Sequence, residues 1–565
     1  MEIADNKTLT QFIQQRAQEI PHSIALVFLN DDGSEEIITA GEFHTRTVHY
    51  AFALKSIGIG LDDLVILVLP HSTELLFAFW GAMYLGAISS ILPFLTEKLD
   101  PEIYKKRVRE LVVHSKARAV ITFPEFKAEL TTLLVDVECT VLGTEDVKKS
   151  SAGEWYEQGW TAPSPDKIAF LQHSSGTTGL QKGVALSHRS VLNQIKAYSL
   201  AIDLQPNDVI VSWLPLYHDM GLIAGFVLPL IAGIPLILMS PFKWVRDPKI
   251  LFQAIHRHGG TLCWLPNFAY NHSARAIRNR DIDGLNLSSM RAFINCSEPV
   301  YQQSHKVFLE KFTSYGLRET ALSTCYAMAE NTFAVTQHRI GRPARIDWVN
   351  IRSLQEDRAA LPVDPEVIGA TPMVSCGHPI SGTEIIIVDE RGESQLDRRV
   401  GEIALRSNCM LNGYFRRPDI SAKSIQNGWY HKGDMGYIAG GELYITGRKK
   451  DLIIVGGKNI YPQDIEAIAN EISGIVPGRS VAFGLFDPSL GSENIVMVCE
   501  LDNGKLPPQE IKALEMKLRR HVLQQSDVAI SDIRFVEKRW LIKTSSGKIS
   551  RSSNREKYIR EFTEE

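Results

Sequence analysis

The chain has 565 residues, of which 44% are hydrophobic and 22% are charged, and its formal net charge is −4. This length exceeds what one compact core supports, so we expect two or more domains with the composition of an ordinary globular protein. The small net charge excludes a surface built to bind nucleic acid or an anionic membrane.

The cysteines and the first residues both bear on the compartment. The start, MEIADNKTLTQF, carries acids and lacks an apolar core, so we expect no secretory signal. The cysteines have no paired spacing, which favours a reducing cytoplasm and indicates neither a disulfide framework nor a zinc site. There are seven, at positions 139, 263, 296, 325, 376, 409 and 499.

Two uncharged stretches, residues 75–95 and 220–242, are each about long enough to cross a bilayer. Both contain Gly and Pro breaks, as buried helix–turn–strand units of a parallel sheet do. No Lys/Arg cluster flanks either stretch in the pattern of a membrane span. We therefore expect buried core and no stable membrane insertion.

Apolar β-branched runs alternate with amphipathic helical stretches through the first two thirds of the chain. Residues 248–258, for example, repeat apolar side chains at helical spacing. Such alternation predicts an α/β architecture with largely parallel sheets. The strands expected here are 64–69, 119–122, 209–213, 236–239 and 261–265.

From Thr383 onward, short strands separated by tight turns predict a mainly antiparallel subdomain. After Lys450, a strand, a Gly-Gly turn and a helix beginning near Pro462 open a small α/β unit. Its remaining elements are expected at 480–487, 493–501, 508–524 and 532–536.

Residues 172–187 read QHSSGTTGLQKGVALS, the segment with the clearest chemistry. Glycines let the main chain bend closely around a ligand, and hydroxyl and N–H groups donate to phosphate oxygens. The spacing is not the Walker pattern, because Gly183 stands where a metal-binding hydroxyl would be. On composition alone, a flexible surface loop remains the alternative. The candidate phosphate-binding residues are Ser174, Ser175, Gly176, Thr177, Thr178, Gly179 and Lys182.

Five further segments follow in order: WLPLYHDMGL (213–222), NCSEPV (295–300), YAMAENT (326–332), WYHKGDMGYIAGGELYITGRKKD (429–451) and TSSGKISR (544–551). Together the six motifs resemble the adenylate-forming superfamily of acyl-CoA synthetases, fatty acyl-AMP ligases, luciferases and peptide-synthetase adenylation domains. The resemblance spans nearly the whole chain. It implies an α/β fold with a large N-terminal domain, 1–448, of parallel-sheet α/β subdomains plus a small β subdomain. A small mobile C-terminal α/β domain, 449–565, would pivot about Lys450.

The resemblance also implies a reaction, in which a carboxylate attacks the α-phosphorus of ATP and pyrophosphate leaves. The developing negative charge calls for cations and donors at the phosphates. Glu330 would hold Mg²⁺ together with Thr177, since hard oxygen ligands suit that ion. Lys548 would swing in with the small domain and bridge the carboxylate and the α-phosphate.

The remaining implied roles concern the nucleoside and the acyl group. Asp434 would accept hydrogen bonds from the ribose hydroxyls, and Arg448 would reach phosphate or ribose oxygens. His218, with Tyr217, would form a gate between the ATP site and the acyl pocket. Adenine would lie among Ser297, Glu298 and Pro299, against the ring of Tyr326 and beside Ala327 and Met328.

Three positions depart from the usual motifs. Ala327 stands where Gly is common, Cys296–Ser297 where Gly–Ala is common, and Lys432 where Thr is common. The backbone conformation at Ala327 is in doubt, and the effect of the extra cation at Lys432 is open. The departures are expected not to touch the catalytic set, which is Lys182, Glu330, Asp434, Arg448 and Lys548.

Several phrases resemble fatty acyl-AMP ligases more than acyl-CoA synthetases. About twenty extra residues, around 345–371, stand where those ligases carry an insertion that is thought to restrain the small domain and disfavour CoA. A neutral surface loop is the other interpretation of this segment. The resemblance therefore implies a fatty acid as substrate and an acyl carrier protein, or a synthase carrier domain, as acceptor, with CoA as the alternative.

Two other functions stay open from sequence. Amino-acid activation is disfavoured, because peptide-synthetase domains place an aspartate at the position of His218, and Asp219 would point elsewhere on a strand-like segment. A nucleotide-binding protein without catalysis is the alternative from a different class, against which Lys548 and Glu330 argue. ATP–pyrophosphate exchange on fatty acids separates these functions.

Overall fold

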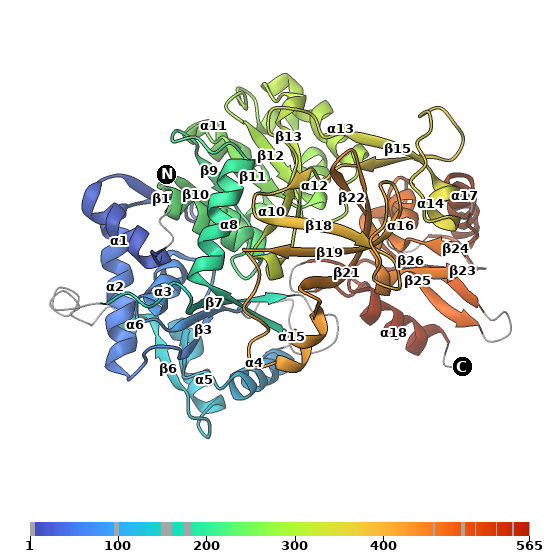
Figure 1. Cartoon of the computed structure of the whole chain (residues 1–565). Coiled ribbons are helices and arrows are strands. Elements are labelled where there is room, and N and C mark those ends of the chain that lie inside the picture. The colour runs from blue at the N-terminus through green and yellow to red at the C-terminus, as the bar shows by residue number, and fades with distance from the viewer. Residues whose placement is uncertain are drawn as a thin grey trace.

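The computed structural model describes residues 6–94, 101–147, 161–174, 182–455, 458–487, 492–502, 504, 506–526, 528–544 and 547–563. In Figure 1 the N-terminal segments lie at the left and the C-terminal segments at the right, with a small antiparallel sheet between them. This order along the molecule places the last part of the chain against the middle part.

The first sheet has six strands in the order β6-β5-β3-β4-β7-β8. All neighbours are parallel except β7 and β8, which form an antiparallel pair. Its central strand β3 is buried on both faces and consists of a continuous apolar run, LVILV. The bounds are β3 (Leu64–Val68), β4 (Ile88–Ile91), β5 (Ala119–Thr122), β6 (Thr140–Gly143), β7 (Ile168–Ser174) and β8 (Lys182–Ser187).

The second sheet has nine strands in the order β17-β14-β13-β12-β11-β9-β10-β1-β2. Its six central strands are parallel, and antiparallel pairs close both ends. The bounds are β1 (Ile24–Leu29), β2 (Glu35–Thr39), β9 (Ile210–Ser212), β10 (Leu236–Met239), β11 (Leu262–Leu265), β12 (Ala292–Asn295), β13 (Leu322–Ala327), β14 (Ala334–Gln337) and β17 (His378–Pro379).

The predicted antiparallel subdomain is present as a five-stranded sheet. Beside it, β15 (Ile346–Asn350) and β16 (Ala370–Val374) form a separate antiparallel pair, joined through helix α14 (Ile351–Glu356). The strands of the five-stranded sheet are β18 (Thr383–Val388), β19 (Gly401–Ser407), β20 (Ile425–Gln426), β21 (Trp429–Ala439) and β22 (Glu442–Arg448).

The C-terminal unit has a core of its own. Its two apolar clusters draw only on residues from Ile453 onward, whereas the main cluster runs from Leu9 to Tyr430. Strands β25, β26 and β27 form its sheet, with β26 and β27 parallel. The bounds are β23 (Ile453–Val455), β24 (Lys458–Ile460), β25 (Ile475–Asp487), β26 (Ser492–Leu501) and β27 (Asp532–Val536).

Helices cover the sheets, as expected for an α/β fold. The expected helices at 248–258 and near Pro462 are both present as α11 (Lys249–His258) and α16 (Pro462–Asn470). The expected strands differ from the observed ones by a residue or two at their ends, except that the segment expected at 480–487 belongs to β25, which begins at Ile475. The remaining helices are α1 (Leu9–Glu19), α2 (Ala40–Ser56), α3 (Thr73–Tyr84), α4 (Pro101–Ser115), α5 (Pro124–Leu133), α6 (Thr144–Val147), α8 (His188–Ala201), α9 (Leu228–Ala232), α10 (Pro241–Arg246), α12 (Asn267–Ala276), α13 (Gln302–Phe312), α15 (Pro418–Ser424), α17 (Pro508–Ser526) and α18 (Arg551–Phe562).

The two uncharged stretches are buried, as predicted. Every residue of α3 but Glu74 is buried, and so is the whole of the π-helix η1 (Met220–Val227). Within the described parts of the chain, no helix has the length and apolar character that a membrane crossing requires.

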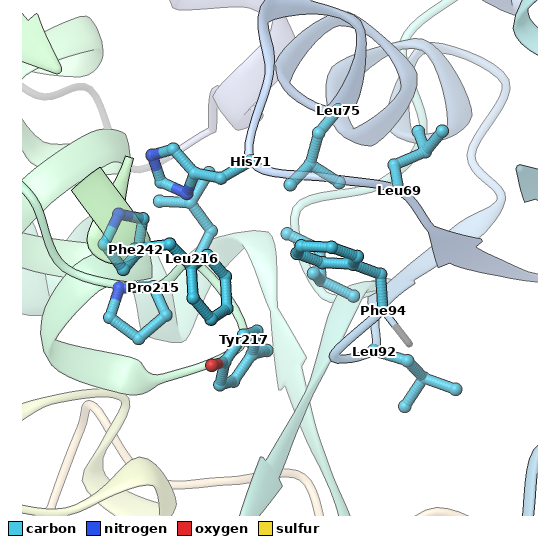
Figure 2. A pocket seen from close by; sticks show the side chains of 11 residues that line it. Leu69, His71, Leu75, Leu92, Phe94, Pro215, Leu216, Tyr217 and Phe242 are labelled. Atoms are coloured by element: carbon cyan, nitrogen blue, oxygen red, sulfur yellow. The ribbon is translucent and has the colours of Figure 1, made fainter. Parts of the chain in front are cut away.

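A small apolar cavity lies where the two large sheets meet. Residues that follow β3 and β4 line one side, and residues 215–217 and the start of α10 line the other. Figure 2 shows Leu216, Tyr217 and Phe242 facing Leu75 and Phe94 across it. The rings of Phe94 and Phe242 pack edge to face, with centroids 5.5 Å apart.

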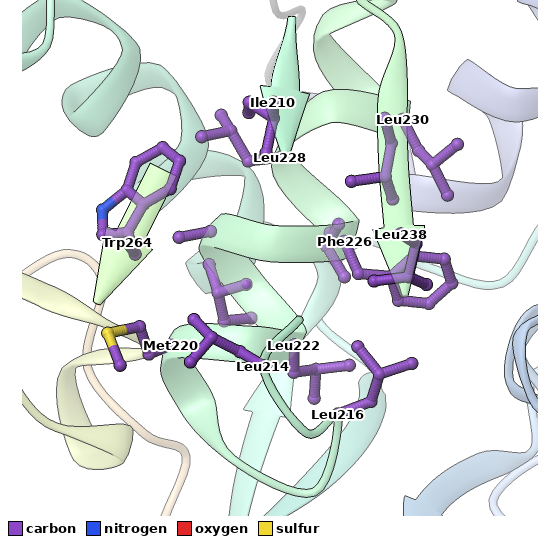
Figure 3. Packing of buried hydrophobic residues seen from close by; sticks show 14 of the residues in the cluster. Ile210, Leu214, Leu216, Met220, Leu222, Phe226, Leu228, Leu230, Leu238 and Trp264 are labelled. Carbon is purple, nitrogen blue, oxygen red and sulfur yellow. The ribbon is translucent and has the colours of Figure 1, made fainter. Parts of the chain in front are cut away.

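The π-helix η1 carries the turn at Tyr217 against the second sheet. A Cβ on Gly221 would lie 2.3 Å from the carbonyl oxygen of Pro215, and one on Gly225 would lie 2.5 Å from Oγ of Ser212. Only glycine allows this approach. In Figure 3, Met220, Leu222 and Phe226 of η1 pack among Leu214, Leu216 and Leu238.

Candidate active site

The predicted phosphate-binding segment is described only at its two ends. Ser175, Gly176, Thr177, Thr178 and Gly179 lie outside the described residues, so their predicted contacts stay predictions, as does the part of Thr177 in metal binding. The backbone of Ser174 ends β7, and Lys182 opens the antiparallel strand β8 opposite it. The hairpin thus brings the described ends of the segment together.

Tyr414 links Lys182 to Glu330. The segment carrying Tyr414 pairs with β8, through Ala185 N–H donating to the Gly413 carbonyl at 3.0 Å. The Lys182 Nζ lies 5.4 Å from the centroid of the Tyr414 ring, and the Tyr414 hydroxyl donates to Glu330 Oε1 at 3.0 Å. Tyr414 carries no motif signal, and the sequence interpretation missed it.

Glu330 is buried and already engaged. It lies in a short 3₁₀ turn between β13 and β14, and its side chain is 3% exposed. Lys432 Nζ donates to Glu330 Oε2 at 2.8 Å. Burial raises the pKa of a carboxyl group, but the ammonium of Lys432, a backbone donor and the Tyr414 hydroxyl together outweigh this, and the pKa of Glu330 is lowered. The expectation that Lys432 would not touch the catalytic set is therefore wrong.

Asp434 and Arg448 face each other across two strands. They are register partners on β21 and β22, and Arg448 Nε donates to Asp434 Oδ1 at 3.1 Å. The Tyr326 hydroxyl donates to Asp434 Oδ2 at 2.6 Å. Burial opposes ionisation, yet Arg448 and Lys432 together lower the pKa of Asp434. A charged two-oxygen acceptor thus stands beside the Tyr326 ring.

The predicted adenine-binding segment follows β12. Ser297 has a left-handed backbone with φ of 68°, which turns the chain toward α12. Glu298 Oε2 accepts from the N–H of Phe268 at 2.9 Å, while Pro299 is exposed. Ala327 ends β13 and is not among the residues with positive φ, so alanine is compatible with this position, and the buried Met328 follows it.

His218 lies in a turn, not in a strand-like segment as the sequence interpretation assumed. The ring of Tyr217 is 6.0 Å from that of His218, and Tyr217 lines the apolar cavity. Asp219 begins η1, accepts from the N–H of Met220 at 2.8 Å, and lies 3.8 Å from His218 Nδ1. Tyr217 thus borders the cavity, and His218 lies beside Asp219; their role as a gate stays a prediction.

Lys548 reaches this site from the C-terminal unit. It is partly buried, and its ammonium interacts electrostatically with the carboxylates of Glu298 and Asp219. Burial lowers the pKa of Lys548, and Glu298 opposes that shift. Asp219 faces both Lys548 and Lys432, a role that the sequence interpretation did not assign to it.

The connection between the two parts of the chain runs through β22. Lys450 lies in the short 3₁₀ turn Lys449–Asp451 directly after it. Gly447 has φ of 155°, and a Cβ there would lie 2.6 Å from the Tyr461 ring. The Tyr301 hydroxyl donates to the carbonyl of Gln463 at 3.1 Å, which joins α13 to α16.

The described residues contain no group of three or more His, Cys, Asp or Glu side chains placed to hold a metal ion. Glu330 thus stands as a single carboxylate among basic and phenolic groups. Such a site suits an ion whose other ligands arrive with a phosphate substrate.

The α/β fold brings charged residues from both parts of the chain together beside an apolar cavity. The sequence profile of AMP-binding enzymes matches residues 13–415. This is well over half of the chain, which therefore belongs to the AMP-binding enzyme family.

Relatives are similar over nearly the whole length. Medium-chain fatty acid–acyl-carrier-protein ligase JamA of Moorena producens is 28% identical over 571 residues, which cover 98% of this chain and 95% of that protein. Long-chain fatty acid–AMP ligase FadD26 of Mycobacterium tuberculosis is 29% identical over 590 residues, covering 98% of this chain and 97% of that one.

Solved structures agree with the fold. One, from a study of fatty acyl-adenylate ligases of E. coli and L. pneumophila, has a TM-score of 0.89 at 27% identity and covers 98% of both chains. A fatty acyl-adenylate ligase of L. pneumophila in complex with acyl adenylate and pyrophosphate has a TM-score of 0.74 at 28% identity, covering 98% of this chain and 96% of that one. The predicted superfamily and fold class are confirmed.

Proposed function

We propose that this protein joins a fatty acid to AMP and then passes the acyl group to the phosphopantetheine thiol of an acyl carrier protein. In the first step a carboxylate oxygen bonds to the α-phosphorus of ATP, and the bond to the β-phosphate oxygen breaks to release pyrophosphate. In the second step the thiol attacks the acyl carbonyl, loses its proton and expels AMP.

One observation carries this proposal: the approach of Lys548 to Asp219 and Glu298, beside the turn that borders the apolar cavity. A cation at this point stabilises the charge that develops on the α-phosphate. Asp434 and Arg448, ion-paired at 3.1 Å, would then hold the ribose and its phosphate. The relatives' names and the bound acyl adenylate of a similar structure support the same reaction.

Mg²⁺ is part of the proposal, with Glu330 as its protein ligand. Among the described residues, Tyr414 donates to one oxygen of Glu330 and Lys432 to the other, and a carboxylate has about four lone-pair sites, so it fits as one ligand of an ion that ATP brings in. The ion would neutralise phosphate charge. Glu330 would hold it, and Tyr414 would keep Glu330 in place.

The proposal includes the division into residues 1–448 and 449–565, with Lys450 as the hinge. Separate apolar cores on the two sides of β22 support it. So does the short turn that contains Lys450, because few residues there have to change conformation. We also place the enzyme in the cytoplasm, which rests on seven scattered cysteines that are all free.

Carrier protein is the proposed acceptor because the extra segment contacts the C-terminal unit. Asn459 Nδ2 donates to the carbonyl of Gln355 at 3.1 Å, and Lys458 pairs with Glu356 at 2.9 Å. These contacts would restrain rotation about Lys450, which transfer to either thiol requires; a carrier protein can offset that cost with contacts of its own surface, which CoA lacks.

The test is an ATP–pyrophosphate exchange assay on a panel of fatty acids, with CoA and a holo carrier protein offered in parallel as acceptors. We expect exchange with fatty acids and thioester formation on the carrier. A protein that binds nucleotide without catalysis would show no exchange, and an acyl-CoA synthetase would transfer to CoA as fast as to the carrier.

Replacing Asp434 with alanine is expected to raise the KM for ATP about tenfold or more, the effect of losing one charge-assisted hydrogen bond. Asp434→Asn, which keeps one oxygen acceptor, should show a smaller rise. Initial rates at varied ATP measure both, and thermal unfolding shows whether Arg448 is tolerated without its partner. An unchanged KM in a folded variant would remove Asp434 from the ribose site.

A further inference from the structure

Lys432 has a position that the shared chemistry of the family does not explain. It lies on β21, two residues before Asp434, and pairs with the buried carboxylate of Glu330 at 2.8 Å. Its own side chain is 25% exposed, so it stands at the border between the buried carboxylate and open space.

Its charged surroundings are shared with the proposed ATP site. Lys432 contributes to the lowered pKa of Asp434 and of Asp219, and it interacts electrostatically with Lys548. The ammonium of Lys432 thus interacts with Asp219, as the C-terminal lysine does, and with Asp434 of the proposed ribose site. ATP brings several negative charges into this cluster, so a cation placed here favours its binding.

We propose that Lys432 is a phosphate-binding residue that pairs with Glu330 until ATP binds. In the free protein its ammonium pairs with Glu330, which keeps this buried carboxylate from standing unpaired. With ATP and Mg²⁺ bound, Glu330 would hold the ion, and the ammonium of Lys432 would donate to a phosphate oxygen instead. This inference rests on the proposed ATP site.

Two consequences follow from this exchange. First, once Glu330 no longer pairs with Lys432, the ammonium supplies ATP with a direct protein cation, because a lysine ammonium is a flexible point charge that binds phosphate well. Second, Mg²⁺ and Lys432 compete for Glu330, so removing the lysine should lower the free Mg²⁺ concentration that half-saturates ATP binding.

The decisive comparison is between Glu330→Gln and the double variant Lys432→Met/Glu330→Gln. Neither leaves a charge buried alone, so they differ only in the ammonium. ATP binding is measured by titration calorimetry without fatty acid, once with EDTA and once at a series of free Mg²⁺ concentrations. With EDTA, we expect the double variant to bind ATP about tenfold or more weakly than Glu330→Gln, the factor of one charge-assisted hydrogen bond.

Lys432→Met alone tests how much Lys432 contributes to the stability of the fold. Its unfolding temperature should be lower than that of the wild type, because Glu330 is left without the ammonium. The double variant should recover much of this decrease in unfolding temperature. Lys127→Met serves as the matched control, since Lys127 pairs with Asp146 at 2.7 Å away from this site. It should leave ATP binding unchanged.

The outcomes are distinct. Equal ATP affinity of Glu330→Gln and the double variant with EDTA would overturn the inference and leave Lys432 as a structural partner of Glu330. Failure of the wild-type protein to bind ATP under either condition would instead contradict the proposed ATP site itself.

Discussion

Replacing Lys548 with alanine is expected to slow acyl-adenylate formation by about 10²–10³-fold, the cost of removing one donor to the transition state. This expectation follows from the position of the Lys548 side chain. Lys548 comes from the C-terminal unit, yet its ammonium interacts with Glu298 and Asp219 of the large part of the chain. In this arrangement of the two parts it would serve the first half-reaction, and rotation about Lys450 would remove it before the thiol enters.

The two half-reactions are therefore measured separately. Pyrophosphate exchange reports on adenylate formation, and transfer from supplied acyl-AMP to a holo carrier protein reports on the second step, which should survive in Lys548→Ala. Lys538→Ala is the matched control, because Lys538 pairs with Asp502 on the same unit at 3.1 Å. Equal loss of both steps would show that Lys548 has another role.

Much of the fold was predictable because burial on two faces leaves a simple signature. Strands such as β5 and β10 are buried at every position and largely apolar, and they were placed to the residue. The π-helix η1 was not foreseen, since its apolar run has no distinct period and its geometry depends on the close contacts of Gly221 and Gly225. The assumption that His218 and Asp219 lie on a strand-like segment failed for the same reason.

Within the site, the motifs identified which residues meet but not how they pair. The contact between Asp434 and Tyr326 was implied by their shared task, whereas the pairing of Lys432 with Glu330 spans 102 positions and has no local signal. The departure from threonine at Lys432 was the only sign in the sequence. Tyr414 had none, because its position depends on pairing with β8.

The extra segment, around residues 345–371, contacts the C-terminal unit in the way that a brace would. These contacts favour the interpretation that the segment restrains the small domain over the interpretation that it is a neutral surface loop. Helix α14 carries Gln355, whose carbonyl accepts from the buried Asn459, and Ile351 and Leu354 pack in one cluster with Tyr461. A buried hydrogen bond contributes about 1 kcal/mol, and an exposed ion pair such as Lys458–Glu356 contributes less. Together the two contacts are enough to shift the equilibrium of rotation about Lys450 several-fold.

Loosening the brace is expected to raise transfer to CoA about 5- to 30-fold, as a change of one to two kcal/mol in a rotation equilibrium allows. The strongest variant replaces residues 351–369 with Asn-Gly, because Asn350 and Ala370 are already paired across β15 and β16 and a two-residue turn can join them. Acyl-adenylate formation should stay within about twofold, since no proposed catalytic residue is removed.

A second, milder pair of double variants keeps the apolar contacts of α14, which the deletion removes. Asn459→Ala with Glu356→Lys breaks both polar contacts and keeps α14, whereas Glu356→Lys with Lys458→Glu reverses the ion pair and should behave like the wild type. Acyl-CoA and acyl-carrier products are quantified side by side by mass spectrometry. If the wild type already acylates CoA as fast as the holo carrier, the segment restrains nothing, and the enzyme is an acyl-CoA synthetase.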